Sequence, residues 1–282
     1  MTRTFLLGAI TLAALLVAQP VRADQREGPE TPWARGAVLV GGFFSAISSD
    51  VRLGVGGVGL EISGEDMLGL DSTTRVFRVD AFYSFDSRKR HRVYFTWYDL
   101  SRSATTTALT DIPIDGNGNK IHEGSTVYTD FDLALYKLAY AYSFFQDDRF
   151  NVAFSVGAYV ADVGIRIQVP LQPPFEPVYE DEALTAPLPV LGLRADFAFT
   201  PKLILRQSVE LFYLEISDYR GHIFDVNTNL EYNIWKHFGM GIGFEFLDFE
   251  LENDKGSFLG ASFTGSVEIR FVGVQLYGKL YF

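Results

Sequence analysis

Three similar stretches of nine residues, each with a period of two, place the strongest constraint on how this chain folds. They occupy residues 77–85, 136–144 and 193–201. Each starts with an aromatic residue or leucine followed by a base, and aromatic and small residues then alternate. Because side chains on a β-strand alternate between its two faces, each stretch predicts a strand with one apolar, aromatic face. A short polar turn follows each copy, so the chain is predicted to repeat a hairpin.

Two features of this alternation favour a membrane barrel. The predicted connections are short at one end of the strands and long at the other, where loops are expected over 103–124 and 171–186, as in outer-membrane barrels. Charged residues also avoid the apolar face. In residues 238–246, five apolar side chains alternate with three glycines and Glu245. Nine such residues, at roughly 3.3 Å each and tilted by about 40°, cover most of an apolar band of ~25 Å.

Alternation alone does not exclude a soluble, lipocalin-like barrel whose apolar face points inward. Aromatic residues just before the turns, such as Tyr142 and Phe144, favour an outward apolar face, because membrane barrels have aromatic girdles. Within a bilayer, only a closed barrel pairs every strand edge. The sequence therefore predicts an all-β fold: a closed antiparallel transmembrane β-barrel with about ten strands, where eight to twelve fit the same pattern.

The last predicted strand, 257–282, changes its apolar face partway along. Apolar residues stand at odd positions up to Phe271 and at even positions from Val272 onward. A β-bulge inserts one extra residue and exchanges the two faces, so we predict one long strand with a bulge at Val272 and Gly273. A turn at this place would instead add a strand and make the strand count odd.

The amino terminus has the features of a secretory signal peptide, predicted to span 1–23. Arg3 precedes an apolar run over 5–18, and Val21 and Ala23 have the spacing that signal peptidase accepts. The apolar run is too short for a membrane helix, and no other stretch is suited to span as one. We expect residues 24–36 to form a flexible periplasmic lead-in and residues 37–282 to form the barrel.

Charge and cysteine content exclude several classes of function. The formal net charge is −11, and without Arg3 and Arg22 of the signal peptide 22 basic residues face 35 acidic ones, which gives −13. An exported protein this acidic is a poor candidate for binding nucleic acid. The absence of cysteine excludes disulfides, thiol catalysis, lipid attachment through cysteine and zinc–thiolate sites.

The last nine residues, 274–282, alternate apolar side chains and end on an aromatic residue. This ending resembles the carboxy-terminal signal of bacterial outer-membrane proteins, which implies that the barrel-assembly machinery recognises Leu280 and Phe282. Tyr277 departs from the pattern, because a glycine is usual there. Further segments, at 65–71, 136–144, 185–193 and 230–232, are similar to a family of proteobacterial outer-membrane β-barrels, OmpA-like or porin-like. That resemblance implies a Gram-negative outer membrane and no particular activity.

Charged residues on the polar face are predicted to gather at one level of the barrel. Arg78, Lys137 and Arg194 occupy equivalent positions in the three repeats. The whole predicted belt consists of Arg78, Asp80, Lys137, Arg194, Asp196, Arg206, Glu210, Glu231 and Glu245. Buried charges are tolerated when paired, and a barrel of about ten strands is only slightly wider than one filled by its own side chains, so a salt-bridged plug is expected. The alternative is a constriction that selects solutes by charge.

Histidines near the predicted outer rim suggest a catalytic alternative. His122 and His222 fall where omptin-like proteases keep their His and Asp residues, and Asp130 or Asp225 would complete a water-activating pair. Isolated rim histidines are usually solvated, so a hydrolase is the least favoured hypothesis.

The predicted function follows from these patterns. We expect an integral outer-membrane barrel that is a non-enzymatic structural or surface protein with a charge-paired lumen; the alternatives are a narrow channel for small solutes and an omptin-like rim hydrolase. A monomer in contact with outer-membrane lipid and lipopolysaccharide is predicted, with no nucleic-acid partner. No cofactor or metal site is predicted, because the calcium-loop-like stretch 115–119 loses the pattern at Lys120 and suits a turn.

Overall fold

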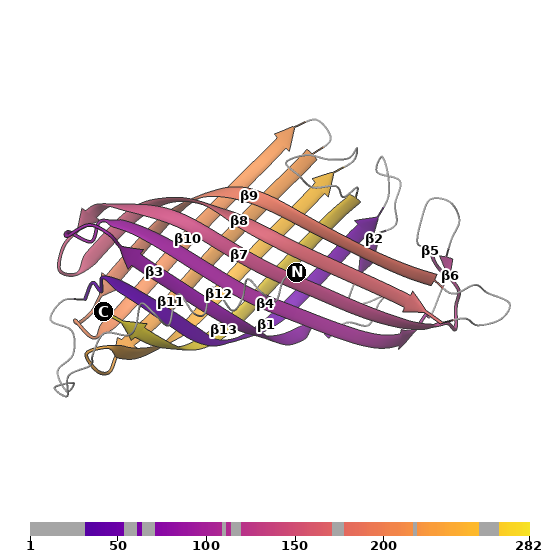
Figure 1. Cartoon of the computed structure of the whole chain (residues 1–282), viewed down its shortest axis with the longest axis horizontal. Coiled ribbons are helices and arrows are strands. Elements are labelled where there is room, and N and C mark those ends of the chain that lie inside the picture. Colours follow the sequence, from indigo (N-terminus) through magenta and orange to yellow (C-terminus); the bar gives the residue numbers. More distant parts are fainter. Residues whose placement is uncertain are drawn as a thin grey trace.

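The computed structural model describes residues 32–53, 61–63, 71–108, 111–113, 120–170, 178–216, 219–253 and 265–282. Ten long strands form one antiparallel sheet that closes through the pairing of β13 with β1 (Figure 1), which confirms the predicted fold class. These strands are β1 (Gly36–Leu53), β3 (Thr73–Ser84), β4 (His91–Thr107), β7 (Thr126–Gln146), β8 (Phe150–Val169), β9 (Val178–Ala198), β10 (Leu203–Ile216), β11 (Tyr219–Asn233), β12 (Phe238–Asn253) and β13 (Gly265–Tyr281). The short β2 (Glu61–Ser63) pairs with β1, and β5 (Ile112–Pro113) and β6 (Lys120–Ile121) form a separate hairpin.

The two ends of the barrel differ in their connections, as predicted. At one end, called the turn end here, the strands are joined by the short segments 85–90, 147–149, 199–202 and 234–237. The opposite end is called the loop end. The barrel begins and finishes at the turn end, where the N–H of Arg35 donates to the carbonyl of Phe282 at 2.8 Å. The predicted signal peptide, residues 65–70 of the segment 65–71 and the calcium-loop-like stretch 115–119 lie outside the described residues. Within the described ranges, no helix is long and apolar enough to cross a membrane.

In the half of the barrel nearest the turn end, apolar side chains point outward and polar ones inward. On β7, Leu138 is 61% exposed on the outer face, whereas its neighbour Lys137 is 5% exposed inside. Phe244 on β12 is exposed, and the adjacent Glu245 is buried. The predicted outward orientation of the apolar face is therefore correct in this half, which is called the turn half.

Toward the loop end, the two faces exchange their chemistry. On β8 the outward residues are apolar up to Val160 and polar from Asp162, while the inward residues change from Ser155 to Val163. The change occurs at the same level on three neighbouring strands, β4, β7 and β8. The last outward row of apolar residues is Trp97, Tyr136 and Val160. The next outward row, called the boundary row here, is Asp99, Ala134 and Asp162. Such an exchange is expected where a barrel leaves an apolar layer and enters water, because apolar side chains then gather inside.

The exchange of faces corrects the predicted bulge at Val272 and Gly273. β13 pairs with β12 from Phe238↔Leu280 to Asn253↔Gly265, and with β1, without any shift of register. Phe271 is inward and Val272 outward, as in a regular strand. The apolar residues change from odd to even positions because the strand passes from a half with an apolar interior into a half with an apolar exterior. Among the described residues, the pairing of β7 with β8 does shift its register, between Ser143 and Phe145 of β7.

Two predicted loops are shorter than expected for the same reason. β9 already begins at Val178, and residues 178–186 pair with β8, although the sequence predicts a loop over 171–186. β4 likewise continues to Thr107 inside the predicted loop 103–124. These extensions lie beyond the apolar outer band. The outward apolar alternation used to recognise strands therefore ends before the strands do.

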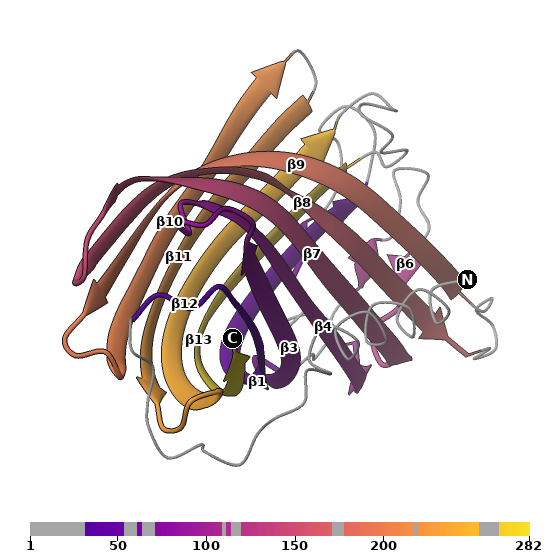
Figure 2. The same cartoon turned by 60° about the vertical axis from the view of Figure 1, so that its left-hand side comes forward.

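Toward the loop end, the wall divides into two sheets. Pairing between β3 and β4 ends at Phe77 and Asp99, and pairing between β9 and β10 ends at Leu191 and Leu211. Within the described residues, each of these strands continues with only its other neighbour. One sheet contains β4, β7, β8 and β9, and the other contains β10 to β13, β1 and β3. Figures 1 and 2 both show β9 diverging from β10 toward the loop end.

Two prolines explain why β9 separates from β10. The N–H of Ala198 donates to the carbonyl of Arg149 at 2.8 Å, so even-numbered residues of β9 direct their backbone groups to the β8 side and odd-numbered ones to β10. In the observed register, the next two hydrogen-bonded pairs would join Pro189 to Tyr213 and Pro187 to Glu215. Proline has no N–H to donate, so β9 offers β10 no donor at either position.

Candidate functional site

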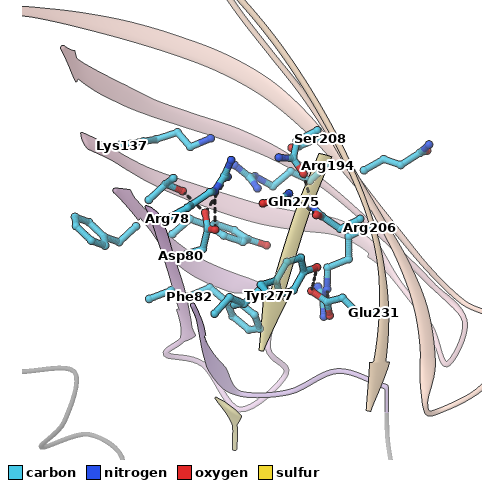
Figure 3. A pocket seen from close by; sticks show the side chains of 18 of the residues that line it. Arg78, Asp80, Phe82, Lys137, Arg194, Arg206, Ser208, Glu231, Gln275 and Tyr277 are labelled. Carbon is cyan, nitrogen blue, oxygen red and sulfur yellow. Dashed lines mark hydrogen bonds and ion pairs between the residues drawn. The ribbon is translucent and has the colours of Figure 1, made fainter. Parts of the chain in front are cut away.

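Charged side chains fill the turn half of the lumen in three groups. Figure 3 shows one member of each, Arg78, Lys137 and Arg206. In the first, the Arg78 group, Arg78 of β3 donates from Nε to Asp80 at 2.7 Å and from Nη1 to Glu245 of β12. Its guanidinium also lies 5.3 Å from the ring centroid of Tyr98. β3 and β12 are not neighbours in the sheet, so the contact between Arg78 and Glu245 crosses the lumen.

The Lys137 group has two cations around one carboxylate. Nζ of Lys137 lies 2.9 Å from Oε2 of Glu210, and Arg194 donates to the other oxygen of the same carboxylate. Lys137 also donates to the hydroxyl of Tyr159 at 2.9 Å and lies 3.5 Å from Oδ2 of Asp225. Because a hydroxyl both donates and accepts, Tyr159 can accept from Lys137 while donating to Asp225.

The Arg206 group lies nearest the turn end. Arg206 donates to Glu231 at 2.9 Å and to Asp196 at 3.0 Å. Nζ of Lys279 donates to Glu231 at 2.6 Å, and Arg92 lies 3.6 Å from Asp196. All five side chains are buried or nearly so. This group joins β4, β9, β10, β11 and β13 across the lumen.

Taken together, the three groups contain as many basic as acidic side chains. Their cations are Arg78, Arg92, Lys137, Arg194, Arg206 and Lys279, and their carboxylates are Asp80, Asp196, Glu210, Asp225, Glu231 and Glu245. Each cation has a carboxylate within ion-pair distance. Pairing offsets the desolvation of a buried charge, and removal of one partner leaves the other uncompensated. The arrangement is thus suited to holding the strands together.

A small cavity lies among these groups (Figure 3). Its volume is about 90 Å³, and Arg78, Lys137, Arg194, Arg206 and Tyr277 are among its lining residues. Such a space has room for a few waters, whereas ligand pockets usually measure about 300 Å³ or more. Nε of Arg194 has no hydrogen-bond partner among the described residues, and a water in this cavity would supply one.

Apolar side chains fill the lumen between the charged groups and the loop end. Phe43 and Phe271 meet at 5.5 Å between ring centroids, and Tyr98 and Phe271 at 5.9 Å. Residues of most strands extend this apolar core, including Leu100, Phe131, Val163, Leu188, Ile223 and Leu247. Apolar side chains predominate in this layer, and the buried polar groups beside them, such as Ser45 and Arg102, are few. A polar solute that reached it would have to give up most of its hydration for little in return.

Trp33 closes the turn end of the lumen. It precedes β1, yet its 6% exposed side chain packs against Ala198 of β9 and Ile204 of β10 on the opposite side of the barrel. Its indole N–H donates to the carbonyl of Asp147 at 2.6 Å. Nζ of Lys89 donates to the carbonyl of Trp33 at 2.5 Å. The segment before β1 therefore crosses the mouth of the barrel.

All nine charged residues predicted for the belt lie inside the barrel and belong to these groups. Sequence reasoning missed Lys279, Tyr159 and Trp33 and did not assign Arg92 to the belt. Lys279 was detectable, since it follows Gln275 and Tyr277 at a spacing of two on the polar face of the last strand. Trp33 stands outside any alternating pattern, and no sequence signal places it at the lumen.

The carboxy-terminal residues lie as a regular strand requires. Leu280 and Phe282 are 44% and 41% exposed on the outer face. Tyr277, which occupies the position where glycine is usual, points inward over two glycines. A Cβ at Gly41 would lie 2.5 Å from Cβ of Tyr277, and one at Gly241 would lie 2.3 Å from its ring. The aromatic ring thus fills the space that these glycines leave, which accounts for the departure from the usual ending.

The structure does not assemble the predicted pair at the rim. His222 lies on the outward face of β11, whereas Asp225 is 1% exposed and points inward to Lys137. Nδ1 of His122 lies 3.7 Å from Asp111, and Asp130 lies on the outward face of β7. The water-activating pair of His222 and Asp225 is therefore wrong, because the alternation along one strand places these residues on opposite faces.

Comparison with known proteins identifies the class to which this fold belongs. No protein-family model matches the chain, and no curated protein matches it in sequence. Among solved structures, the chain is similar to the outer membrane protease OmpT from Escherichia coli, with a TM-score of 0.53, 9% identity, and coverage of 87% of this chain and 97% of OmpT. At that identity the likeness shows the fold alone, which is that of the outer-membrane β-barrels.

Two further barrels align over similar lengths. The attachment invasion locus protein Ail of Yersinia pestis has a TM-score of 0.34 and 11% identity, with 88% of this chain and 98% of Ail covered. The toluene transporter TodX of Pseudomonas putida has a TM-score of 0.37 and 7% identity, with 90% and 89% covered. The narrower family resemblance described above stays a prediction.

Proposed function

We propose that this protein is an integral outer-membrane barrel with a closed lumen, which acts as a structural or surface protein and conducts no solute. The membrane position is supported by the boundary row at Asp99, Ala134 and Asp162, where the outer surface changes from apolar to polar. A barrel entirely in water has no reason to expose apolar side chains such as Leu138 at 61%. In this position, the part of the barrel between the boundary row and the loop end projects from the membrane.

One observation supports the closed lumen above all others: two different barriers lie in series. The paired charged groups occupy the turn half of the lumen. The apolar core around Phe43 and Phe271 fills the lumen between these groups and the loop end. A selective channel needs polar groups that replace the hydration of a solute along its whole path. The apolar core offers few, such as Ser45 and Arg102, so a channel is disfavoured even where the charged groups rearrange.

Planar-bilayer conductance of refolded residues 24–282 tests this proposal. The parent protein is expected to give no steady current steps, with a general porin added to the same bilayer as a positive control. Lys137→Ala is also expected to give none, because the apolar core persists when the charged groups are disturbed. Steady steps in the parent would overturn the proposal in favour of a channel. Steps in Lys137→Ala alone would make the charged groups the main barrier.

A further inference from the structure

The separation of the wall into two sheets leaves an unpaired strand edge on β4. From Leu100 to Thr107, β4 pairs with β7 on one side and, among the described residues, with no strand on the other. The N–H of Phe85 donates to the carbonyl of His91, and the N–H of Ala108 donates to the carbonyl of Ser125. The backbone N–H and C=O groups of odd-numbered β4 residues therefore point toward the β3 side, and those of even-numbered residues point toward β7.

This parity defines which backbone groups the edge offers. They are the N–H and C=O groups of Ser101, Ser103, Thr105 and Thr107, whose side chains are small, hydroxylated and exposed on the outer surface. Threonine favours extended strands, and the segment 101–107 contains no proline and no outward charge. Unpaired edges of this kind are templates for an added strand.

The edge on the other side of the same sheet provides a contrast. β9 also loses its partner toward the loop end, but Pro187 and Pro189 remove the first two N–H groups that would face an added strand beyond Leu191. Proline on an edge strand is one way in which proteins prevent pairing with other chains. The β9 edge is thus interrupted by proline at two positions, whereas the β4 edge over 101–107 has no proline.

Charges on the outer face of the sheet indicate what kind of strand would fit. Near the β4 edge, Asp99 is exposed on β4 itself, and Asp132 and Asp130 on β7 lie opposite Ser101 and Ser103. On β8 the same face has Asp162 and the single base Arg166. Serine side chains leave space for a long basic side chain to extend from an added strand toward the β7 carboxylates.

We propose that the β4 edge, residues 101–107, binds an extended basic segment of a partner protein, which joins the sheet as an additional antiparallel strand. Main-chain hydrogen bonds supply the attachment, and lysine or arginine at alternate positions meets the outer carboxylates. This role goes beyond a closed barrel and rests on different residues, so its failure leaves the non-conducting function untouched.

Binding of labelled peptides to the refolded parent protein tests the edge directly. The probe is an eight-residue peptide with alternating lysine and threonine, compared with one in which glutamate replaces lysine. In an antiparallel arrangement, residues with outward side chains also direct their N–H groups to β4. N-methylation of the lysine amides is therefore expected to weaken binding at least tenfold, and N-methylation of the threonine amides to leave it within twofold.

Protein variants locate the site. Ser103→Pro removes one edge N–H and is expected to weaken binding about tenfold, whereas Ser103→Val keeps the N–H and binds like the parent. If Ser103→Pro does not fold, the N-methylated peptides still decide the question with the parent protein. If only N-methylation of the threonine amides weakened peptide binding, the added strand would be parallel, and the β4 edge would still be the binding site. The proposal is overturned if both N-methylated peptides bind alike, or if the glutamate peptide binds as well as the lysine peptide.

Discussion

Lys137 is a buried cation that three acceptors share: Glu210, Asp225 and the hydroxyl of Tyr159. Lys137→Met keeps most of the side-chain volume but leaves Asp225 without a cation. We predict a loss of about 3–5 kcal/mol in the free energy of unfolding, the usual cost of removing one partner of a buried pair. Urea unfolding in lipid micelles measures it. Lys236→Met, in an exposed turn, should change stability by less than about 0.5 kcal/mol.

If Lys137→Met were as stable as the parent, the charged groups would not be contributing to the stability of the barrel. The double variant Lys137→Met with Asp225→Asn leaves Arg194 paired with Glu210 and so provides a second test. Removal of both opposite charges is expected to cost less than the sum of the two single changes, because each single change leaves a charge uncompensated.

The carboxylate of Asp147, in the turn between β7 and β8, is expected to make the stability of the fold depend on pH. The backbone N–H groups of Phe150 and Arg149 donate to its carboxylate, and they hold its pKa below the ordinary value. A lowered folded pKa gives stability that is fully present above the unfolded pKa of about 4 and is lost as the pH falls through the folded pKa. Asp147→Asn should therefore lose stability less steeply than the parent below about pH 4.

Chemical unfolding at a series of pH values measures this difference. Asp148→Asn removes the same charge from the neighbouring exposed position and serves as the matched control. Parallel pH profiles for the parent and Asp147→Asn would contradict the assignment of these backbone hydrogen bonds.

At the scale of the strand, the contact between β1 and β13 that closes the barrel depends on one of two adjacent glycines. A Cβ at Gly41 would lie 2.2 Å from the carbonyl oxygen of Leu276, whereas a Cβ at Gly42 would meet no atom within 4 Å. We predict that Gly41→Ala destabilises the barrel by about 1–3 kcal/mol through crowding against Leu276 and Tyr277. Gly42→Ala should be nearly neutral.

Thermal or urea unfolding of the two variants checks this prediction, and the adjacent glycine controls for backbone entropy. Equal stability of Gly41→Ala and Gly42→Ala would show that Tyr277 does not pack on β1 as described. The packing matters beyond this strand, because Tyr277 also covers Gly241 of β12 and so connects three neighbouring strands.

The strands also show what alternation in the sequence can and cannot predict. Period two identifies each strand and separates its faces, and aromatic residues near the turns are enough to direct the apolar face outward in the turn half. Alternation cannot show that inside and outside exchange partway along a strand. For this reason Phe271 and Val272 suggest a bulge in the sequence, while the backbone continues without a shift of register.

For the whole molecule, the strand count and the inward position of the nine charged residues could be predicted, because both depend on local alternation. Their partners could not be predicted, since Arg78 and Glu245 meet across the lumen from strands that are far apart in sequence. Pro187 and Pro189 are visible in the sequence, but their effect on pairing follows only from the register with β10. Closure of the turn end by Trp33 depends on how the strands curve in space. The sequence alone does not encode that curvature in a recognisable pattern.

The central claim is that the lumen is closed, and cysteine labelling tests it most directly because the chain contains no cysteine. Ser208→Cys places a thiol in the wall of the small cavity, and Thr105→Cys places one on the exposed outer face of β4. Both variants are treated in the folded state with a charged, membrane-impermeant thiol reagent. We predict rapid modification of Thr105→Cys and modification of Ser208→Cys only after unfolding in urea. Modification of folded Ser208→Cys at a rate similar to Thr105→Cys would contradict the closed lumen.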